Sequence, residues 1–201
     1  MAAWIQVSAP PRLAHDDQQE PLRISCAFDH APYFTELAKV EAIIARTNRV
    51  PAEAKRACTQ SLLSLAQEQH YTAGKWMLFF PPDEADVGWE AIARATAQGE
   101  LGCSAKIAPA AGLLPADRAV CCVYVHDFAE RAEVRRVLWA LRRMGMDVTS
   151  GFKPDVYTEL NIMSDNQWRL EPTIYKVKDV LEWPDDIARA AYQRVRASPW
   201  G

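Results

Sequence analysis

The sequence lacks the features that would place it in several large classes of protein. It has no run approaching the roughly 18 uninterrupted apolar residues of a membrane span, no CxxC pair among its five cysteines, and no repeat or low-complexity tract. Its 23 basic and 26 acidic residues give a net charge of −3. These absences exclude a spanning helix, a disulfide framework or zinc site, a repeat array and a bulk nucleic-acid surface.

Targeting and cofactor signals are also missing. The opening string MAAWIQVSAPPRLAHDDQQ has no basic flank leading into a long apolar segment, so we expect a reduced, cytoplasmic protein. The four histidines are scattered, and nothing groups them as metal ligands. We therefore expect no metal and no cofactor, and the oligomeric state stays open.

The composition is that of a globular chain with one sizeable core. Of the 201 residues, 49% are hydrophobic and 24% charged, which suffices for a single domain. We expect residues 1–30 to form an N-terminal arm with a candidate strand at 22–28. Residues 31–201 then form one domain, composed of a helical pair at 33–70 and a core of strands and helices at 71–201.

Periodicity and capping signals predict the elements of this domain. The clearest helix start is Asp127, with Glu130 three residues later, which is typical of a capping box. The order predicts an α+β fold with a curved, mainly antiparallel sheet and helices on one face; a ferredoxin-like fold is the alternative. The expected helices are 33–48, 51–69, 86–99, 127–145 and 185–196, and the expected strands are 74–80, 103–109, 119–126, 148–162 and 173–177.

Lysine is scarce, and its placement is the best functional clue. The chain has seven lysines against sixteen arginines. Three lysines lie in short strand-like runs that each include a glycine: Lys75 in GKWMLFF, Lys106 in LGCSAKIA and Lys153 in SGFKPD. Strand alternation places Lys75 on the face opposite Trp76, which we expect to be buried. Met77 shares the face of Lys75.

Two lysines on facing positions of neighbouring strands have a specific chemistry. Ammonium groups held close together lower each other's pKa, which suits lysine to acid–base work near neutral pH. They also bind phosphate, and Arg118, Lys153 or Arg169 can add bidentate or further contacts. The alternative is that the lysines extend from strand ends to water or pair with acidic residues.

Further polar and aromatic residues are candidates for the same groove. His126 ends a strand on the face of Tyr124 and is a candidate base. The segment KPDVYTELNIMSDNQWR combines amides, an aromatic plane and a guanidinium, which are the groups a ligand groove uses. A solvated sheet face covered by a tryptophan is the alternative. The candidates of this segment are Tyr157, Asn161, Asn166, Trp168 and Arg169.

Several strings together resemble the basophilic-leukaemia-expressed protein family. They are TAGKWMLFF, GELGCSAKIAP, CCVYVHDFAERAEVRRVLWALRRMG, GFKPDVYTELNI and NQWRLEPTIY, in that order, over roughly residues 70–178. The family is largely uncharacterised. The resemblance implies a fold like that of the eukaryotic cap-binding translation initiation factor, with helices on the convex face of a curved sheet and a ligand groove on the other.

A second resemblance is to the bacterial phosphothreonine lyases, in which strand lysines, a histidine and arginines surround a phosphorylated side chain. Lys75 and Lys106 are thirty-one residues apart and Arg118 follows twelve later, which is similar to that layout. That family has its histidine base two residues after the first lysine, where this sequence has Met77. The resemblance implies a carbon–oxygen lyase that eliminates phosphate.

In that reaction each candidate has an implied role. Lys75 stabilises the developing enolate and Lys106 protonates the leaving phosphate, while His126 or a neutral lysine takes the α-proton. Arg118 and Arg169 hold the phosphate.

The leading hypothesis is therefore a pocket for a phosphorylated peptide or nucleotide, with elimination as its most concrete activity. One alternative is a non-catalytic module for a nucleotide or capped RNA, using Trp168 beside Arg169. The other is a protein-interaction domain that uses the helical pair.

Overall fold

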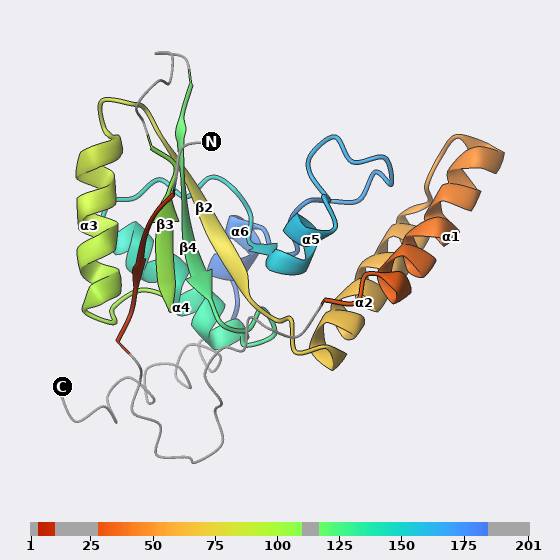
Figure 1. The fold of residues 1–201 in the computed structure, drawn as a ribbon, viewed down its shortest axis with the longest axis horizontal. Coiled ribbons are helices and arrows are strands. Elements are labelled where there is room, and N and C mark those ends of the chain that lie inside the picture. Colours follow the sequence, from red (N-terminus) through yellow and green to blue (C-terminus); the bar gives the residue numbers. More distant parts are fainter. Residues whose placement is uncertain (1–3, 11–27, 110–116, 185–201) are drawn as a thin grey trace. The chain divides into compact units, whose positions relative to one another are not determined.

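The computed structural model describes residues 4–10, 28–109 and 117–184; the other residues are drawn as a thin grey trace in Figure 1. Internal contacts divide the chain into two compact units, which are described separately below. The first unit comprises Met1–Pro10, Ala73–Pro154 and Thr173–Gly201, and the second comprises Pro11–Thr72 and Asp155–Pro172.

The first unit is built on a five-stranded sheet in which every neighbouring pair is antiparallel. The strand order is β1-β3-β4-β2-β5 (Figure 1). The fold is therefore α+β with a mainly antiparallel sheet, as predicted. The strands are β1 (Ile5–Ser8), β2 (Gly74–Phe80), β3 (Ser104–Ile107), β4 (Ala119–Val125) and β5 (Lys153–Pro154).

Three helices lie in the described part of this unit: α3 (Ala85–Ala97), α4 (Arg131–Arg143) and α6 (Val177–Leu181). From β2 onward the chain runs β2-α3-β3-β4-α4-β5, and these strands lie in the order β3-β4-β2-β5. This is the β-α-β-β-α-β order of ferredoxin-like domains, the predicted alternative, with β1 added at one edge.

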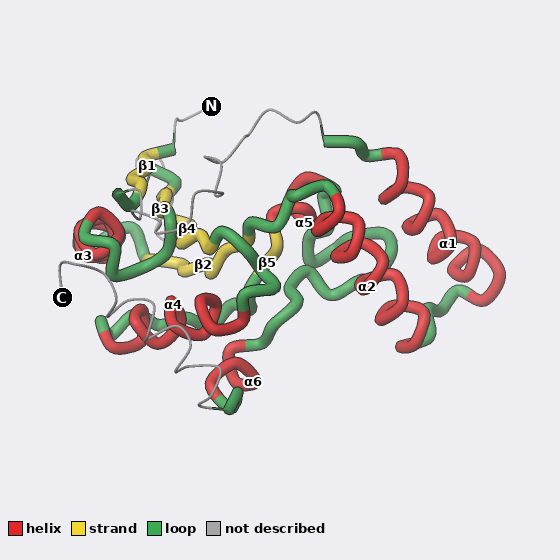
Figure 2. Tube along the Cα trace, turned by 90° about the horizontal axis from the view of Figure 1, so that it is seen from below, coloured by secondary structure: helices red, strands yellow, loops and turns green. Residues whose placement is uncertain are grey.

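The helices α3 and α4 bury one face of this sheet. Trp76 on β2 is fully buried, and its indole N–H donates to the Val134 carbonyl of α4 at 3.0 Å. Gly88 of α3 lies against the Phe80 ring of β2, where an added Cβ would come within 2.6 Å of the ring. Figure 2 shows α4 on one side of the strands. Because side chains alternate along a strand, Lys75 and the other odd-numbered residues of β2 belong to the opposite face.

The second unit is helical. Its elements are α1 (Ala31–Thr47), α2 (Ala52–Glu68) and the short α5 (Asp155–Glu159). Helices α1 and α2 are antiparallel neighbours that bury Leu37 and Val40 from one and Leu62 from the other. A left-handed Asn48 ends α1, with its backbone N–H on the Ile44 carbonyl at 2.7 Å. The three-and-four spacing of apolar residues predicts α1, and Pro51 followed by a run of leucines predicts α2. The structure confirms both helices.

The region after α4 differs from its prediction. The strand expected at 148–162 is reduced to β5, and a helix follows at once. Pro154 has no N–H to continue the ladder, and Asp155 begins the first turn of α5. The strand expected at 173–177 is a single bridge between Phe152 and Tyr175 before α6.

Two further predictions are corrected at element ends. The Asp127 side chain accepts from the Ala129 N–H at 2.8 Å, so it closes a turn, and α4 begins only at Arg131. Residues 1–30 were expected to be an arm, but Ile5–Ser8 form strand β1. The alternation of apolar and polar residues in IQVS is consistent with this strand. Of the candidate strand at 22–28, all but the last residue lies outside the described residues. The expected helix at 185–196 lies entirely outside them. The single domain at 31–201 stays a prediction.

Among the residues that the structure describes, no helix combines the length and the hydropathy needed to cross a membrane.

Candidate functional site

The strand register brings the three predicted lysines to one face of the first unit's sheet. Lys75 on β2 lies opposite Lys153 on β5 and opposite Tyr124 on β4. On the other side of β4, Tyr124 lies opposite Ser104, and Lys106 lies two residues further along β3. Directly opposed residues of antiparallel strands point to the same face. Lys153, Lys75, Tyr124 and Lys106 therefore form one row, which we call the lysine row.

Aromatic rings are interleaved with the cations of this row. The Lys75 Nζ lies 5.4 Å from the centroid of the Tyr124 ring, and the Lys106 Nζ lies 5.3 Å from the same centroid. The Lys106 Nζ also lies 4.7 Å from the centre of the Trp4 ring. These distances are within the range of cation–π interaction. Tyr124 thus lies between two ammonium groups. Trp4 continues the row at the edge of the sheet, and we include it in the lysine row from here on.

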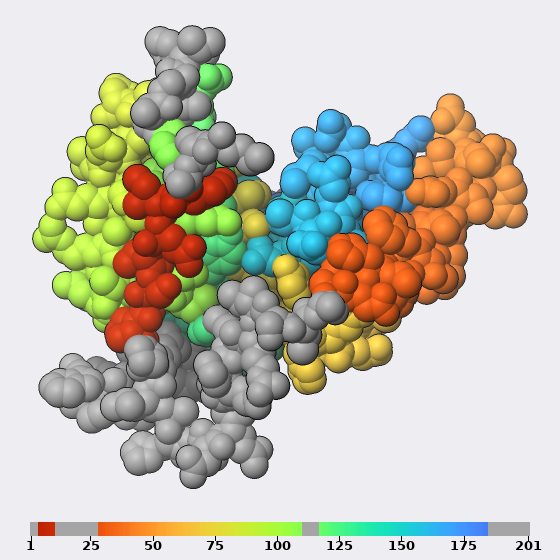
Figure 3. All heavy atoms as spheres, in the orientation of Figure 1, coloured from red at the N-terminus to blue at the C-terminus, as the bar shows by residue number. Residues whose placement is uncertain are grey.

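Exposure changes along the lysine row. Lys153 and Lys75 are only 4% and 6% exposed, whereas Tyr124 and Lys106 are partly exposed and Trp4 is 46% exposed. The five strands contain three lysines and no Asp or Glu. The row is therefore enclosed at its Lys153 and Lys75 end, where both lysines have partners of their own, and open at its aromatic end. In Figure 3 the atoms of β1 (red) lie on the visible surface.

Glycines account for the close approach of the strands that carry the lysines. A Cβ at Gly74 would lie 2.5 Å from the Phe152 ring, which precedes Lys153. A Cβ at Gly102 would overlap the Tyr124 carbonyl oxygen, which accepts from the Cys103 N–H at 2.9 Å. Larger residues at either position would push β2 or β3 away from its neighbour. The glycine in these lysine runs is thus a packing requirement of the row.

The predicted alternation around Lys75 is confirmed. Met77 lies on the face of the lysine row, opposite Cys122, and Trp76 lies on the helix-covered face. A thioether therefore occupies the place next to Lys75 where the lyase pattern has a histidine. It has no proton-accepting group suited to acid–base catalysis.

Two other predicted residues of the first unit lie beyond the lysine row. His126 is exposed and directly follows β4, two residues beyond Tyr124, which lies in the middle of the row. Arg118 lies six residues before Tyr124, about 20 Å along an extended strand. Its guanidinium donates to the Phe79 carbonyl at 3.3 Å. The structure thus brings His126 near the row and separates Arg118 from it.

The remaining candidates belong to the second unit, and its secondary structure corrects the argument for them. Tyr157 lies on helix α5, not on a strand, and is fully buried. Burial raises the pKa of Tyr157 to about 12, against a smaller lowering by Thr59. Asn161 follows α5 in a left-handed conformation, with φ of 55°. The polar strand face expected from Tyr157 and Asn161 is not formed, because α5 does not alternate.

The loop after α5 is held by its own polar groups. Trp168 is 7% exposed, and its indole N–H donates to Glu41 Oε1 at 2.8 Å. Asn166 donates to the Met163 and Leu170 carbonyls and accepts from the Leu170 N–H. These partners give Trp168 and Asn166 a structural role, so we leave them out of the candidate site.

Arg169 is similarly engaged. Its guanidinium donates to the Asn48 carbonyl at 2.7 Å and to the Asn48 side-chain oxygen at 3.0 Å. The phosphate-holding role expected for Arg169 has no support in this geometry.

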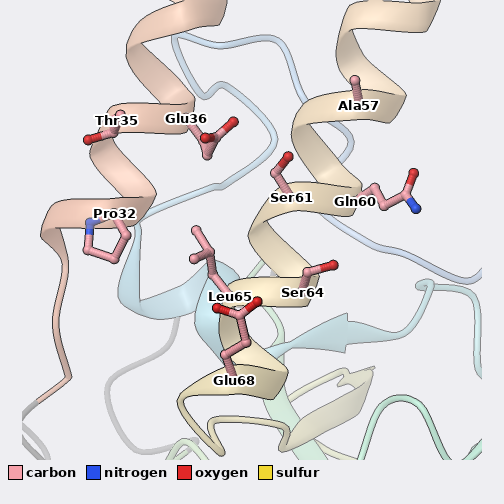
Figure 4. Close-up of a pocket in the computed structure, with 9 residues that line it drawn as sticks. All are labelled: Pro32, Thr35, Glu36, Ala57, Gln60, Ser61, Ser64, Leu65 and Glu68. Carbon is pink, nitrogen blue, oxygen red and sulfur yellow. The ribbon is translucent and has the colours of Figure 1, made fainter.

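The second unit also has a hollow between α1 and α2, of about 710 Å³, which sequence reasoning missed. Figure 4 shows Glu36 of α1 and Ser61 of α2 on facing sides of it. Its carboxylates, Glu36 and Glu68, make it unsuited to an anion. Its lining is Pro32, Thr35, Glu36, Ala57, Gln60, Ser61, Ser64, Leu65 and Glu68.

Trp4 is the residue of the lysine row that the sequence argument missed. It belongs to residues 1–30, which Pro10, Pro11 and the polar run HDDQQE predict to be an arm. The period-two pattern of WIQVS, with Ile5 and Val7 alternating against Trp4 and Gln6, was the available signal.

The fold and the row define an α+β sheet protein with a lysine- and aromatic-bearing face. The chain belongs to the family of the basophilic leukemia-expressed protein Bles03, whose family model matches residues 27–161. The match covers α1 and α2 as well as the strands from β2 to β5, so it begins well before the region in which the resemblance was seen. The description of this family states no function, so the geometry of the site must indicate one. Among the described residues, no three His, Cys, Asp or Glu side chains gather as metal ligands.

Proposed function

We propose that the lysine row binds a phosphate-bearing ligand. The observation that carries the proposal is the convergence of Lys153, Lys75 and Lys106 from three strands onto one face, with the Nζ atoms of Lys75 and Lys106 at 5.4 and 5.3 Å from the Tyr124 ring centroid. Phosphate oxygens accept hydrogen bonds from ammonium groups, and such charge-assisted bonds are about twice as strong as neutral ones.

The burial of Lys75 and Lys153 at one end of the row favours binding at a defined site. It does not favour a general attraction of anions to the whole chain. The chain as a whole carries a net charge of −3, so any attraction must come from local charges. Lys75 and Lys153 are almost fully buried, and electrostatic interactions of buried charges are less screened by salt than those at the surface. Binding at this end should therefore persist at physiological ionic strength.

Elimination of phosphate is the catalytic form of this proposal. A base takes the α-proton, the electron pair forms the carbon–carbon double bond, and phosphate leaves with a proton from Lys106 while Lys75 stabilises the enolate. Met77 supplies no base, so His126 or a neutral lysine is required for this step. The stacking alternative based on Trp168 and Arg169 loses support, because both side chains are held within the second unit.

Calorimetric titration with inorganic tripolyphosphate and with a phosphothreonine peptide tests binding. We expect Lys106→Met to weaken binding of the ligand at least tenfold, because methionine keeps the length of the side chain and removes its charge. The matched control is Lys178→Met, an exposed lysine on α6 of the same unit, which should leave the affinity unchanged. Absence of saturable binding by both ligands, or equal affinity of the wild type and Lys106→Met, would refute the proposal.

Mass spectrometry of the phosphothreonine peptide after incubation tests elimination separately. Loss of phosphoric acid that disappears in Lys106→Met supports the catalytic form. An unchanged peptide at high protein concentration leaves a binding site without lyase activity.

A further inference from the structure

We infer that the phosphate-bearing ligand of the lysine row also carries a nucleobase, so that the ligand is a nucleotide, either free or at the end of a single strand. This inference rests on the proposed function and specifies its ligand. It depends on a feature that phosphate binding alone leaves unexplained, which is the aromatic end of the row.

Trp4 supplies the exposed aromatic ring at the edge of the sheet. It directly precedes strand β1, in which Gln6 lies opposite Lys106. Trp4 is 46% exposed although it lies over the Lys106 ammonium, at 4.7 Å from ring centre to Nζ. An exposed tryptophan beside a cation is a stacking surface next to a phosphate contact, a combination that nucleotide sites use.

Tyr124 supplies a second aromatic ring on the same face of the sheet. Its partly exposed ring lies between the ammonium groups of Lys75 and Lys106, which are 5.4 and 5.3 Å from its centroid. In order across the sheet, the row reads Lys153, Lys75, Tyr124, Lys106 and Trp4. The rings of Tyr124 and Trp4 thus flank Lys106, and Lys75 and Lys153 follow on the other side of Tyr124, over neighbouring strands that are about 4.8 Å apart.

The gradient of exposure gives the ligand a direction. Its charged groups would lie at the partly exposed Lys106, on the side toward the buried Lys75 and Lys153, and its planar group would lie on the exposed ring of Trp4. A nucleotide has this polarity, with phosphates at one end and a base at the other. Inorganic phosphate and a phosphothreonine side chain have no planar group to place on the ring.

The arrangement of the sheet supports the same ligand class. Sheets of β-α-β-β-α-β order that bind single-stranded RNA stack bases on aromatic residues of an uncovered face. Here α3 and α4 cover the Trp76 face, and the rings of Tyr124 and Trp4 belong to the other. The net charge of −3 implies that stacking, more than a wide basic surface, must supply the preference for a base.

The experiment compares ATP with inorganic tripolyphosphate by calorimetric titration of the full chain. Tripolyphosphate carries the charge without the base. We expect ATP to bind roughly 5- to 100-fold more tightly, which is the range that stacking on one ring gives. The Trp4→Ala variant should lose most of this preference while its tripolyphosphate affinity changes less than about twofold. Trp139→Ala, which removes an exposed tryptophan from α4, is the matched control and should keep the preference.

The outcomes separate this inference from the proposed function. Equal affinities for ATP and tripolyphosphate, or a Trp4→Ala variant that keeps the preference, overturn the nucleotide inference and leave phosphate binding intact. Tighter binding of the phosphothreonine peptide than of ATP also overturns it. If neither ATP nor tripolyphosphate binds, both proposals fail. Preference for a 5′-phosphorylated oligonucleotide over ATP supports a strand end as the source, and the reverse supports a free nucleotide.

Discussion

The two units use the same kinds of side chain in different ways. In the first unit, Lys106 and Tyr124 lie side by side on a sheet face, with the Lys106 Nζ 5.3 Å from the centroid of the Tyr124 ring. In the second unit, Trp168 and Arg169 also combine a ring with a cation, but Glu41 and Asn48 hold their polar groups. Residue type alone therefore does not mark a ligand site. On the sheet, Tyr124 and Lys106 stay partly exposed beside each other, whereas the loop uses its polar groups to hold itself.

Charge separates the two units in the same sense. The first unit has 15 Lys and Arg against 14 Asp and Glu, and the second has 8 against 12. The acidic second unit carries the hollow lined by Glu36 and Glu68. An anionic ligand is therefore better suited to the first unit, which agrees with the position of the lysine row.

The largest effect is expected from the tryptophan that anchors the sheet to its helices. Trp76→Ala removes a fully buried side chain, its hydrogen bond to Val134 and its edge contact with Phe152, whose ring centroid is 5.3 Å away. We expect the free energy of unfolding to fall by about 3–5 kcal/mol. Urea unfolding followed by far-ultraviolet circular dichroism measures this change.

Trp139→Ala is the control for this substitution, because Trp139 is 43% exposed on α4. It should cost less than about 1 kcal/mol. Similar losses for Trp76→Ala and Trp139→Ala would contradict the assignment of the helix-covered face, and with it the face on which Lys75 lies.

Much of the first unit could be predicted from the sequence because its strands carry strong local signals. The run GKWMLFF is bounded by Gly74 and by two prolines, and it forms β2 with the predicted limits. The lysines were found because they are rare and follow glycine. Because side chains alternate along a strand, Lys75 must lie on the face opposite Trp76. This holds whichever strands pair with β2.

The segment from Lys153 to Trp168 could not be predicted in the same way. Its β-branched and aromatic residues favour a strand locally, but Pro154 ends the ladder and the buried Val156 and Tyr157 belong to a helix. The structural role of Trp168 depends on Glu41, which is 127 residues away in the chain. Because this partner is so distant in the chain, the sequence around Trp168 does not indicate that its ring is buried. The local sequence therefore predicted a stacking surface where the structure has a packed side chain.

An intermediate effect is expected at alkaline pH. Burial raises the pKa of the Cys121 thiol from 9.0 to about 12 and that of the Cys58 thiol to about 11. The unfolded thiols lose their protons near pH 9, while the folded thiols keep them. The unfolded state then binds fewer protons, so stability falls as pH rises above about 9.

Urea unfolding at pH 8 to about 10.5 measures this loss, which approaches 1.4 kcal/mol per pH unit for each thiol. Cys121→Val should reduce the slope in the first unit and Cys58→Val in the second. Cys58 ionises at a lower pH in the folded state, so its contribution should level off sooner. An unchanged slope in both variants would show that neither thiol stays protonated when folded.

The smallest effect is expected from Trp168→Phe. The substitution keeps a six-membered aromatic ring in a site that is 7% exposed, and it removes the rest of the indole together with the N–H that donates to Glu41. Glu41 is exposed and regains water, so we expect a loss of about 1–2 kcal/mol in urea unfolding, from the hydrogen bond and a small cavity. The variant should bind ATP like the wild type, whereas Trp4→Ala should not. A loss of ATP affinity in Trp168→Phe without a loss of stability would reverse the comparison of the two units, because the second unit would then contain the stacking surface.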